Sequence, residues 1–133
     1  MKNNLRIASL LPSATEIVCV LGLEENLVGV THECDFPPSV IAKPKLTSSR
    51  ISHERMTSSE IDHAVRLFVA DAKVISLEPN TISDIFENIL FVGEVCGVKQ
   101  KAIEVVSALR RRLEIITEKT KNISSRPKCF MME

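Results

Sequence analysis

The hydrophobic and polar positions at the start of the chain predict a strand, a helix and a second strand. Residues 6–11 and 27–30 are short apolar runs, which are typical of buried strands. Between them, Ser13 and Glu16 have the spacing of a capping box, and Gly22 is a typical helix stop. Short buried strands that are joined by a helix favour a parallel sheet.

The rest of the chain is mostly helical by the same criteria. Thr57 and Glu60 form a second capping box in front of an apolar helical stripe. The elements predicted after the second strand are a helix over roughly 58–69, a strand over 74–77, and helices over 82–96 and 99–121, separated by Gly97. At a rise of 1.5 Å per residue, the last helix is roughly 30 Å long, the width of a small domain.

The last two predicted helices each carry one apolar stripe, which predicts a face that packs against a core. The stripe residues are Ile82, Ile85, Ile89, Val92 and Cys96 on the first of them, and Ala102, Val105, Val106, Leu109, Leu113 and Ile116 on the second.

Length and composition bound the fold. The 133 residues suffice for one core, and 44% hydrophobic with 26% charged residues is ordinary for a soluble globular chain. We therefore expect an α/β fold with a small parallel sheet of three to four strands flanked by helices. It forms a single Rossmann-like lobe that ends in a long helix.

Charge and aromatic content argue against nucleic-acid binding. Seventeen basic residues balance seventeen acidic ones, and five Phe with no Trp or Tyr offer no stacking platform. The basic excess lies in residues 99–121, where Arg110, Arg111 and Arg112 are consecutive and so point in different directions on a helix. We interpret this run as a solvated helix surface.

The cysteines and the N-terminus suggest neither a disulfide framework nor export. The four cysteines are far apart and form no C-x-x-C pair, which also argues against a zinc site. Pro12 to Glu16 interrupts the early apolar run, no cleavage site follows cleanly, and we find no membrane-spanning run. The sequence as given therefore predicts a cytoplasmic location.

Two polar segments follow the first two predicted strands. Pro12 to Thr15 lies at a helix N-terminus, which binds polar or anionic groups well, although simple capping explains it too. Thr31 to Asp35 follows the second strand and suits the rim of a site better than a buried position. The phosphate-binding glycine motifs are absent. Because the carboxyl ends of parallel strands share one edge, both segments predict a ligand site there.

Catalysis at this edge has less support. Contiguous polar residues converge poorly on one metal ion, and Cys34 with His32 lacks an orienting third group. A ligand-contact or loop-bracing role remains open for Thr31 to Asp35. Arg50 lies in a polar loop, where solvation and ligand contact are both open, and Glu78 to Thr81 is either a further part of the rim or a plain turn.

The strings S-A-T-E, L-V-G-V-T-H-E-C-D-F-P-P and L-E-P-N-T resemble the helical-backbone periplasmic-binding-protein family. More narrowly, they resemble the cobalamin-binding subgroup of ABC-transporter substrate-binding proteins, which also take iron–siderophores. The resemblance covers most of the chain, and T-H-E-C-D-[FY]-P is fairly specific to that subgroup. It implies a non-enzymatic protein with no catalytic residue, resident metal or cofactor. Its transported ligand, cobalamin or a related metal chelate, is held between two α/β lobes joined by a long helix.

The resemblance also assigns residue roles. The ligand-binding residues that we predict from the loops and from the resemblance are Pro12, Ser13, Thr15, His32, Glu33, Cys34, Asp35 and Arg50. Glu60 corresponds to a surface glutamate that docks on arginines of the membrane permease in related proteins. The resemblance thus implies an ABC permease as a partner.

The sequence departs from the family pattern in two places. Compared with that pattern, we expect a strand and a cysteine-bearing loop to be missing between Val69 and Val74, and we expect the second lobe to be missing. We expect an incomplete N-terminal lobe (1–98), the inter-lobe helix (99–122) and the first strand of a missing lobe (123–133). In such a chain binding is weakened and an exposed sheet edge favours self-association.

Two rival hypotheses stay open. One is a small α/β enzyme that uses Cys34 with His32 or His53, and the other is a fragment without function.

Overall fold

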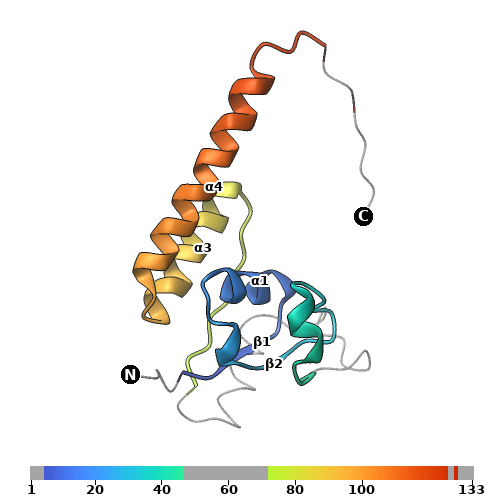
Figure 1. Ribbon diagram of the computed structural model, residues 1–133, viewed down its shortest axis with the longest axis vertical. Coiled ribbons are helices and arrows are strands. Elements are labelled where there is room, and N and C mark those ends of the chain that lie inside the picture. Colours follow the sequence, from blue (N-terminus) through green and yellow to red (C-terminus); the bar gives the residue numbers. More distant parts are fainter. Residues whose placement is uncertain (1–4, 47–71, 126–127, 129–133) are drawn as a thin grey trace.

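The computed structural model describes residues 5–46, 72–125 and 128. In chain order the elements are β1 (Ile7–Ser9), α1 (Pro12–Val20), a 3-10 turn (Glu24–Asn26), β2 (Leu27–Val30), a second 3-10 turn (Pro38–Ala42), α3 (Ile82–Val95) and α4 (Lys99–Thr120). Figure 1 shows α3 and α4 side by side, and α4 extends well beyond the rest of the described core. The predicted α/β class and long final helix are confirmed. The predicted helix over 58–69 lies outside the described residues.

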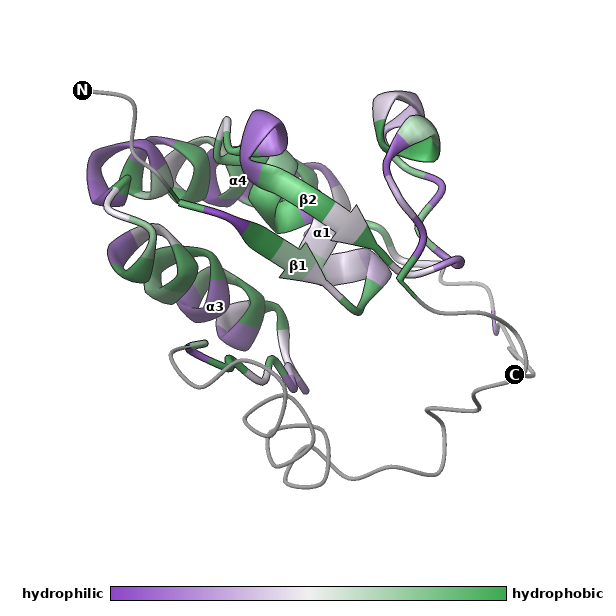
Figure 2. Cartoon of the chain, turned by 90° about the horizontal axis from the view of Figure 1, so that it is seen from below, coloured by the Kyte–Doolittle hydropathy of each residue, from purple (hydrophilic) through white to green (hydrophobic). Residues whose placement is uncertain are grey.

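The sheet is a parallel pair. β1 pairs with β2, with Ala8 opposite Gly29 and Ser9 opposite Val30 (Figure 2). Along the other side of β2, Val30 donates its N–H to the carbonyl of Pro44 and accepts from the N–H of Leu46, both at 2.9 Å. A single parallel bridge therefore extends the sheet there.

The predicted strand over 74–77 is wrong. Residues 72–79 form no strand, so the sheet has two strands within the described residues instead of the expected three to four. An apolar run becomes a strand only where a neighbouring edge offers backbone N–H and C=O partners. In the structure Val74 and Leu77 are partly buried, as their apolar character indicates. The sequence pattern does not show whether a strand edge is within reach.

The predicted capping box at α1 is also wrong. The N-cap is Leu11, which has no side-chain capping bond, and Pro12 occupies the first helical turn. Proline suits that place because its fixed φ matches the helix and its missing N–H would have no helical partner there. Ser13 therefore lies inside the first turn and is exposed.

The predicted helix stops are confirmed. Gly22 and Gly97 have φ of 77° and 75°, a backbone conformation that glycine adopts without a steric cost. After α1, Gly22 N–H donates to Cys19 and Leu23 N–H to Val18, which is the Schellman pattern.

The N-terminus of α3 has a capping box that the sequence reasoning missed. Asp84 donates its N–H to Thr81 Oγ1 at 3.2 Å, and Asp84 Oδ2 accepts from the N–H groups of Thr81 and Asn80, each at 2.8 Å. The T-x-x-D spacing carried this signal, since aspartate can replace the glutamate of the usual pattern at this distance. The Thr81 side chain, and then the two N–H groups, hold the pKa of Asp84 below its usual value.

We expect Asp84→Asn to make the stability of the chain less dependent on pH. Because the folded-state pKa is lowered, the contribution of Asp84 is fully present above the unfolded-state pKa and is lost as pH falls through the folded-state pKa. The Tm difference between the two proteins should therefore be largest at neutral pH and vanish in acid. Thermal unfolding across this range measures it, with the exposed Glu104→Gln on α4 as control. A Tm difference that is independent of pH contradicts the assignment.

The core lies between α1, the strands, α3 and the first half of α4. Ala102 and Val106 of the predicted stripe on α4 are buried, whereas Leu113 and Ile116 are 37% and 57% exposed. On α3, Phe86 is buried, although the predicted stripe contained Ile82 and did not contain Phe86. Periodicity identifies the apolar face of a helix, but not how far along its length another element covers that face.

Candidate functional site

The loops that follow β1 and β2 begin beside each other. The two strands are parallel, and Thr31 N–H donates to the carbonyl of Ser9 at 3.0 Å where both strands end. The segments starting at Pro12 and Thr31 therefore leave the same edge of the sheet, as the sequence predicts. Edges of this kind are where open α/β folds bind ligands.

A buried chain of polar side chains fixes these two loops to each other. Thr15 is completely buried, and its Oγ1 lies 2.8 Å from Ser9 Oγ and 3.0 Å from Cys34 Sγ. Ser9 Oγ in turn donates to the carbonyl of Leu11 at 3.2 Å. Side chains from β1, from the start of α1 and from the loop after β2 thus meet within hydrogen-bonding distance.

These side chains can all donate their protons if every hydrogen bond points in the same direction along the series. If the Cys34 thiol donates to Thr15, Thr15 donates to Ser9 and Ser9 donates to Leu11, each group uses its single proton once. Such a connected arrangement orders the loops, since a buried polar group without a partner destabilises the fold. Of the two roles left open for this segment, the buried contacts of Thr15 and Cys34 favour bracing of the loops over direct ligand contact.

The other predicted residues of the two loops face solvent. Ser13, His32, Glu33 and Asp35 are exposed, and Pro12 is partly buried. Among the predicted ligand-binding residues at this edge, Thr15 and Cys34 are therefore buried, whereas the others just named are exposed or partly buried. Arg50 and Glu60, together with His53 of the enzymatic hypothesis, lie outside the described residues.

Lys45 contacts the second loop, which the sequence reasoning missed. Its Nζ donates to the carbonyl of Cys34 at 3.0 Å. No sequence signal indicates this contact, because it depends on the bridge that brings Lys45 alongside Val30. The exposed lysine therefore brings a positive charge to the backbone of the loop that carries Glu33 and Asp35.

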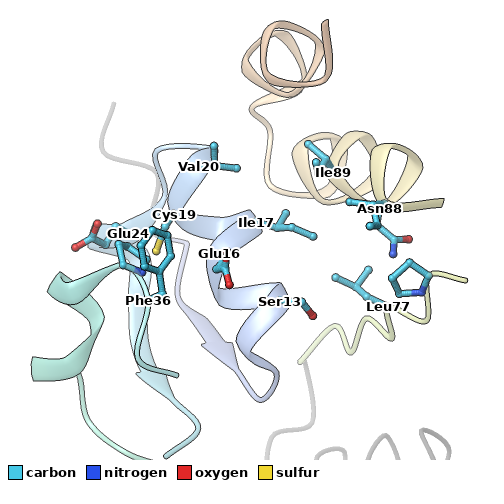
Figure 3. A pocket seen from close by; sticks show the side chains of 13 residues that line it. Ser13, Glu16, Ile17, Cys19, Val20, Glu24, Phe36, Leu77, Asn88 and Ile89 are labelled. Atoms are coloured by element: carbon cyan, nitrogen blue, oxygen red, sulfur yellow. The ribbon is translucent and has the colours of Figure 1, made fainter. Parts of the chain in front are cut away.

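A pocket of about 560 Å³ opens beside this edge, within the size range of small-molecule sites. One face of α1 forms its floor, Phe36 stands on one side, and Leu77 and Asn88 stand on the other (Figure 3). The lining residues are Ser13, Glu16, Ile17, Cys19, Val20, Glu24, Phe36, Pro37, Leu77, Pro79, Ile85, Asn88 and Ile89. Burial, followed by the charge of Glu24, raises the pKa of the Cys19 thiol.

Cys34 is poorly placed to act as a nucleophile. Its side chain is only 2% exposed and lies against Thr15, whereas His32 faces solvent. A catalytic thiol must be accessible to substrate and activated by a base. The geometry therefore does not favour the enzymatic hypothesis.

We expect Cys34 to react with iodoacetamide much more slowly in the folded chain than a free thiol does. Burial blocks the approach of the reagent, so the reaction requires local opening. Mass spectrometry of the peptide that contains Cys34 measures the rate, and the same peptide in denaturant is the control. Labelling of Cys34 faster than a model thiol would reverse this conclusion and support the enzymatic hypothesis.

The described residues contain no group of three potential metal ligands. Of the helices in the described part of the chain, none combines the length and the apolar character that crossing a membrane requires.

Comparison with known proteins identifies relatives of this chain. No family model matches it. The chain is 30% identical over 134 residues to the uncharacterized ABC transporter substrate-binding lipoprotein YvrC of Bacillus subtilis. The match includes 90% of this chain and 43% of YvrC, so the chain spans less than half the length of this curated relative.

Three solved structures share the fold at low sequence identity. They are a possible iron-binding (periplasmic solute-binding) protein of Staphylococcus epidermidis (TM-score 0.73, 21% identity), the periplasmic heme-binding protein RhuT of Roseiflexus (0.74, 20%) and the periplasmic vitamin B12 binding protein BtuF of Vibrio cholerae (0.67, 21%). The matches cover 91%, 94% and 88% of this chain, but 53%, 53% and 51% of those proteins.

These relatives are described as a lipoprotein and as periplasmic proteins, so they do not support the expected cytoplasmic location. The resemblance seen in the sequence is confirmed by an independent match in sequence and by matches in fold. The chain is thus similar in sequence to an ABC transporter substrate-binding lipoprotein, and its described part has the fold of the periplasmic binding proteins.

Proposed function

We propose that this chain binds cobalamin or a related metal chelate as part of the substrate-binding component of an ABC-type uptake system. The observation that carries the proposal is the convergence of the loops after β1 and β2 at one sheet edge, beside the 560 Å³ pocket. The kinship with YvrC and the fold shared with iron-, heme- and vitamin B12-binding proteins support it. Like these relatives, the protein would act outside the cytoplasmic membrane.

In this proposal the exposed and buried residues have different tasks. Ser13, His32, Glu33 and Asp35 contact the ligand directly, because their side chains face solvent at the edge. Thr15 and Cys34 hold the two loops in place through their buried contact. An Arg50 contact with the ligand and Glu60 docking on an ABC permease remain predictions.

The affinity of the 133-residue chain by itself is expected to be low. Its match spans about half of each solved relative, so a ligand would meet only part of the contact surface that those longer proteins offer. Fewer contacts leave less free energy to offset the entropy lost on binding. Weakened binding is therefore part of the proposal, and self-association through an exposed strand edge remains a prediction.

Titration of the folded chain with cyanocobalamin, followed by calorimetry and by the corrinoid absorption spectrum, tests the proposal. We expect saturable binding that weakens by about tenfold in the His32→Ala/Glu33→Ala double variant, because the contacts of an imidazole and a carboxylate are lost. Glu118→Ala is the matched control, since this exposed glutamate lies on α4. The proposal fails if a sample that unfolds cooperatively shows no binding at millimolar cyanocobalamin.

A further inference from the structure

The outer half of α4 carries an apolar stripe that is left exposed. Leu113 and Ile116 are 37% and 57% exposed, and beside them Ile82 of α3 is 53% exposed. Together with Phe86 and Leu109, these residues form the apolar lining of a shallow groove of about 240 Å³ between the start of α3 and α4. Figure 1 shows this half of α4 extending away from the core. Apolar surface gathered in this way marks an interaction site.

The charges that border this α4 stripe are positive. Arg112 lines the groove, and the guanidinium carbon of Arg110 lies 5.5 Å from the centre of the aromatic ring in it. Lys119 follows Arg112 by seven positions and so borders the same side of the stripe, whereas Glu114 and Glu118 fall on the opposite face of the helix. Two such stripes would set cations against cations. The surface that complements the α4 stripe is therefore apolar and acidic.

The pocket of about 560 Å³ between α1 and α3 has this character (Figure 3). Its lining is mostly apolar, and Val20, Phe36 and Ile85 in it are 47%, 59% and 40% exposed. The charged residues that line it, within the described part of the chain, are Glu16 and Glu24. A groove between two helices accepts the apolar face of a third helix.

The α4 stripe of one copy cannot reach the pocket of the same copy. The first half of α4 packs against α3, and the same helix then continues away from the core as far as Thr120 (Figure 1). A continuous helix does not fold back on itself, so these two complementary surfaces meet only when they belong to different copies.

We propose that the α4 stripe of one copy docks into the pocket between α1 and α3 of a second copy. Leu113 and Ile116 enter the pocket, and the cations that border the stripe face Glu16 and Glu24 of the other copy. The two surfaces differ, so the contact is heterologous. Copies therefore either exchange both contacts and close as a dimer, or add head to tail.

This association is distinct from the pairing of strand edges, and it does not rest on the proposed function. One helix in one pocket makes a small contact, at the weak end of protein–protein interfaces. We therefore expect the chain to associate at high protein concentration and to be monomeric when dilute.

Dilution of the folded, isotope-labelled chain from millimolar to micromolar concentration tests the inference. Backbone amide shifts should change with concentration at residues 112–117 and at the pocket positions of α1 and α3, and sedimentation velocity on the same samples should give a matching dissociation constant. A chain that remains monomeric at millimolar concentration overturns the inference, whether or not α4 binds phosphatidylglycerol vesicles. Absence of cyanocobalamin binding leaves it standing.

Replacement of one apolar residue separates the stripe from the rest of α4. Ile116→Asp should raise the dissociation constant at least about tenfold, because it places a carboxylate among apolar groups and opposite two glutamates. Ile115→Asp is the matched control. Ile115 is 48% exposed, but it lies about 100° further round the helix and outside the groove. Equal effects of the two variants would contradict the docking of this face.

A mixture of two defective variants identifies the contact as heterologous. The Glu16→Lys/Glu24→Lys double variant should also associate at least about tenfold more weakly, because its pocket repels the cations of the stripe. This variant retains an intact stripe, and Ile116→Asp retains an intact pocket. When the two are mixed, they should associate, and the shifts in labelled Ile116→Asp should be confined to the pocket. Association that survives in each variant alone would point to strand edges and overturn the inference, as would a mixture that stays monomeric.

Discussion

Gly93→Val is expected to destabilise the chain by about 3 kcal/mol, at the upper end of the usual cost of overpacking. Gly93 lies on the buried face of α3, where a Cβ atom would overlap the Cβ of Ala102 on α4. Ala102 is itself completely buried, so neither helix can yield without separating from the other. The helix propensity of valine, which exceeds that of glycine, offsets only a small part of this cost.

Urea unfolding of Gly93→Val, compared with the unsubstituted chain, measures this effect. Ala108→Val places the same side chain on the exposed face of α4 and should cost only a few tenths of a kcal/mol. If the two variants lose the same stability, α3 and α4 do not pack as closely as described. A lower m-value in Gly93→Val, but not in Ala108→Val, would instead indicate a loosened native state, because less surface would then become exposed on unfolding.

Thr15→Val is expected to lower stability by about 2 kcal/mol, within the usual range for buried hydrogen bonds that lose a partner. Valine nearly preserves the shape of threonine, so the change isolates the hydroxyl group. It leaves the Cys34 thiol without its hydrogen-bond partner and the Ser9 hydroxyl without its donor. Because these contacts join the two site loops, ligand affinity should fall in parallel.

Thr15→Ser and Ser13→Ala are the matched controls for this prediction. Thr15→Ser keeps the hydroxyl, so it should retain more stability than Thr15→Val although it has lost a methyl group. Ser13→Ala removes an exposed hydroxyl from the same helix and should hardly change the free energy of unfolding. Equal stability of Thr15→Val and the unsubstituted chain would show that the buried polar chain does not brace the loops.

Within the described residues, the sequence pattern predicts the three α-helices and the first two strands well, because these elements depend on nearby residues. Helical spacing and the glycine stops Gly22 and Gly97 suffice to place α1, α3 and α4. The strand over 74–77 failed because its formation depends on a distant edge that periodicity does not reveal.

Some features of the candidate site could likewise be predicted from the sequence, and others could not. Convergence of the two loops follows from the parallel sheet alone and could be predicted. Cys34 is buried, whereas His32, Glu33 and Asp35 on either side of it are exposed. A run of polar residues does not predict this difference. The pocket was missed because its lining comes from α1, α3 and the segments around Phe36 and Leu77, which only tertiary packing brings together.

Mapping of backbone amide chemical shifts during titration with cyanocobalamin tests the central claim most directly, namely that the loops after β1 and β2 form the ligand-binding edge. We predict shifts concentrated at Ser13 and at residues 32–36, with smaller ones along the pocket at Asn88. The exposed part of α4 from Arg111 to Thr120 should not respond. Shifts confined to α4, or no shifts in a folded sample at millimolar ligand, would contradict the account.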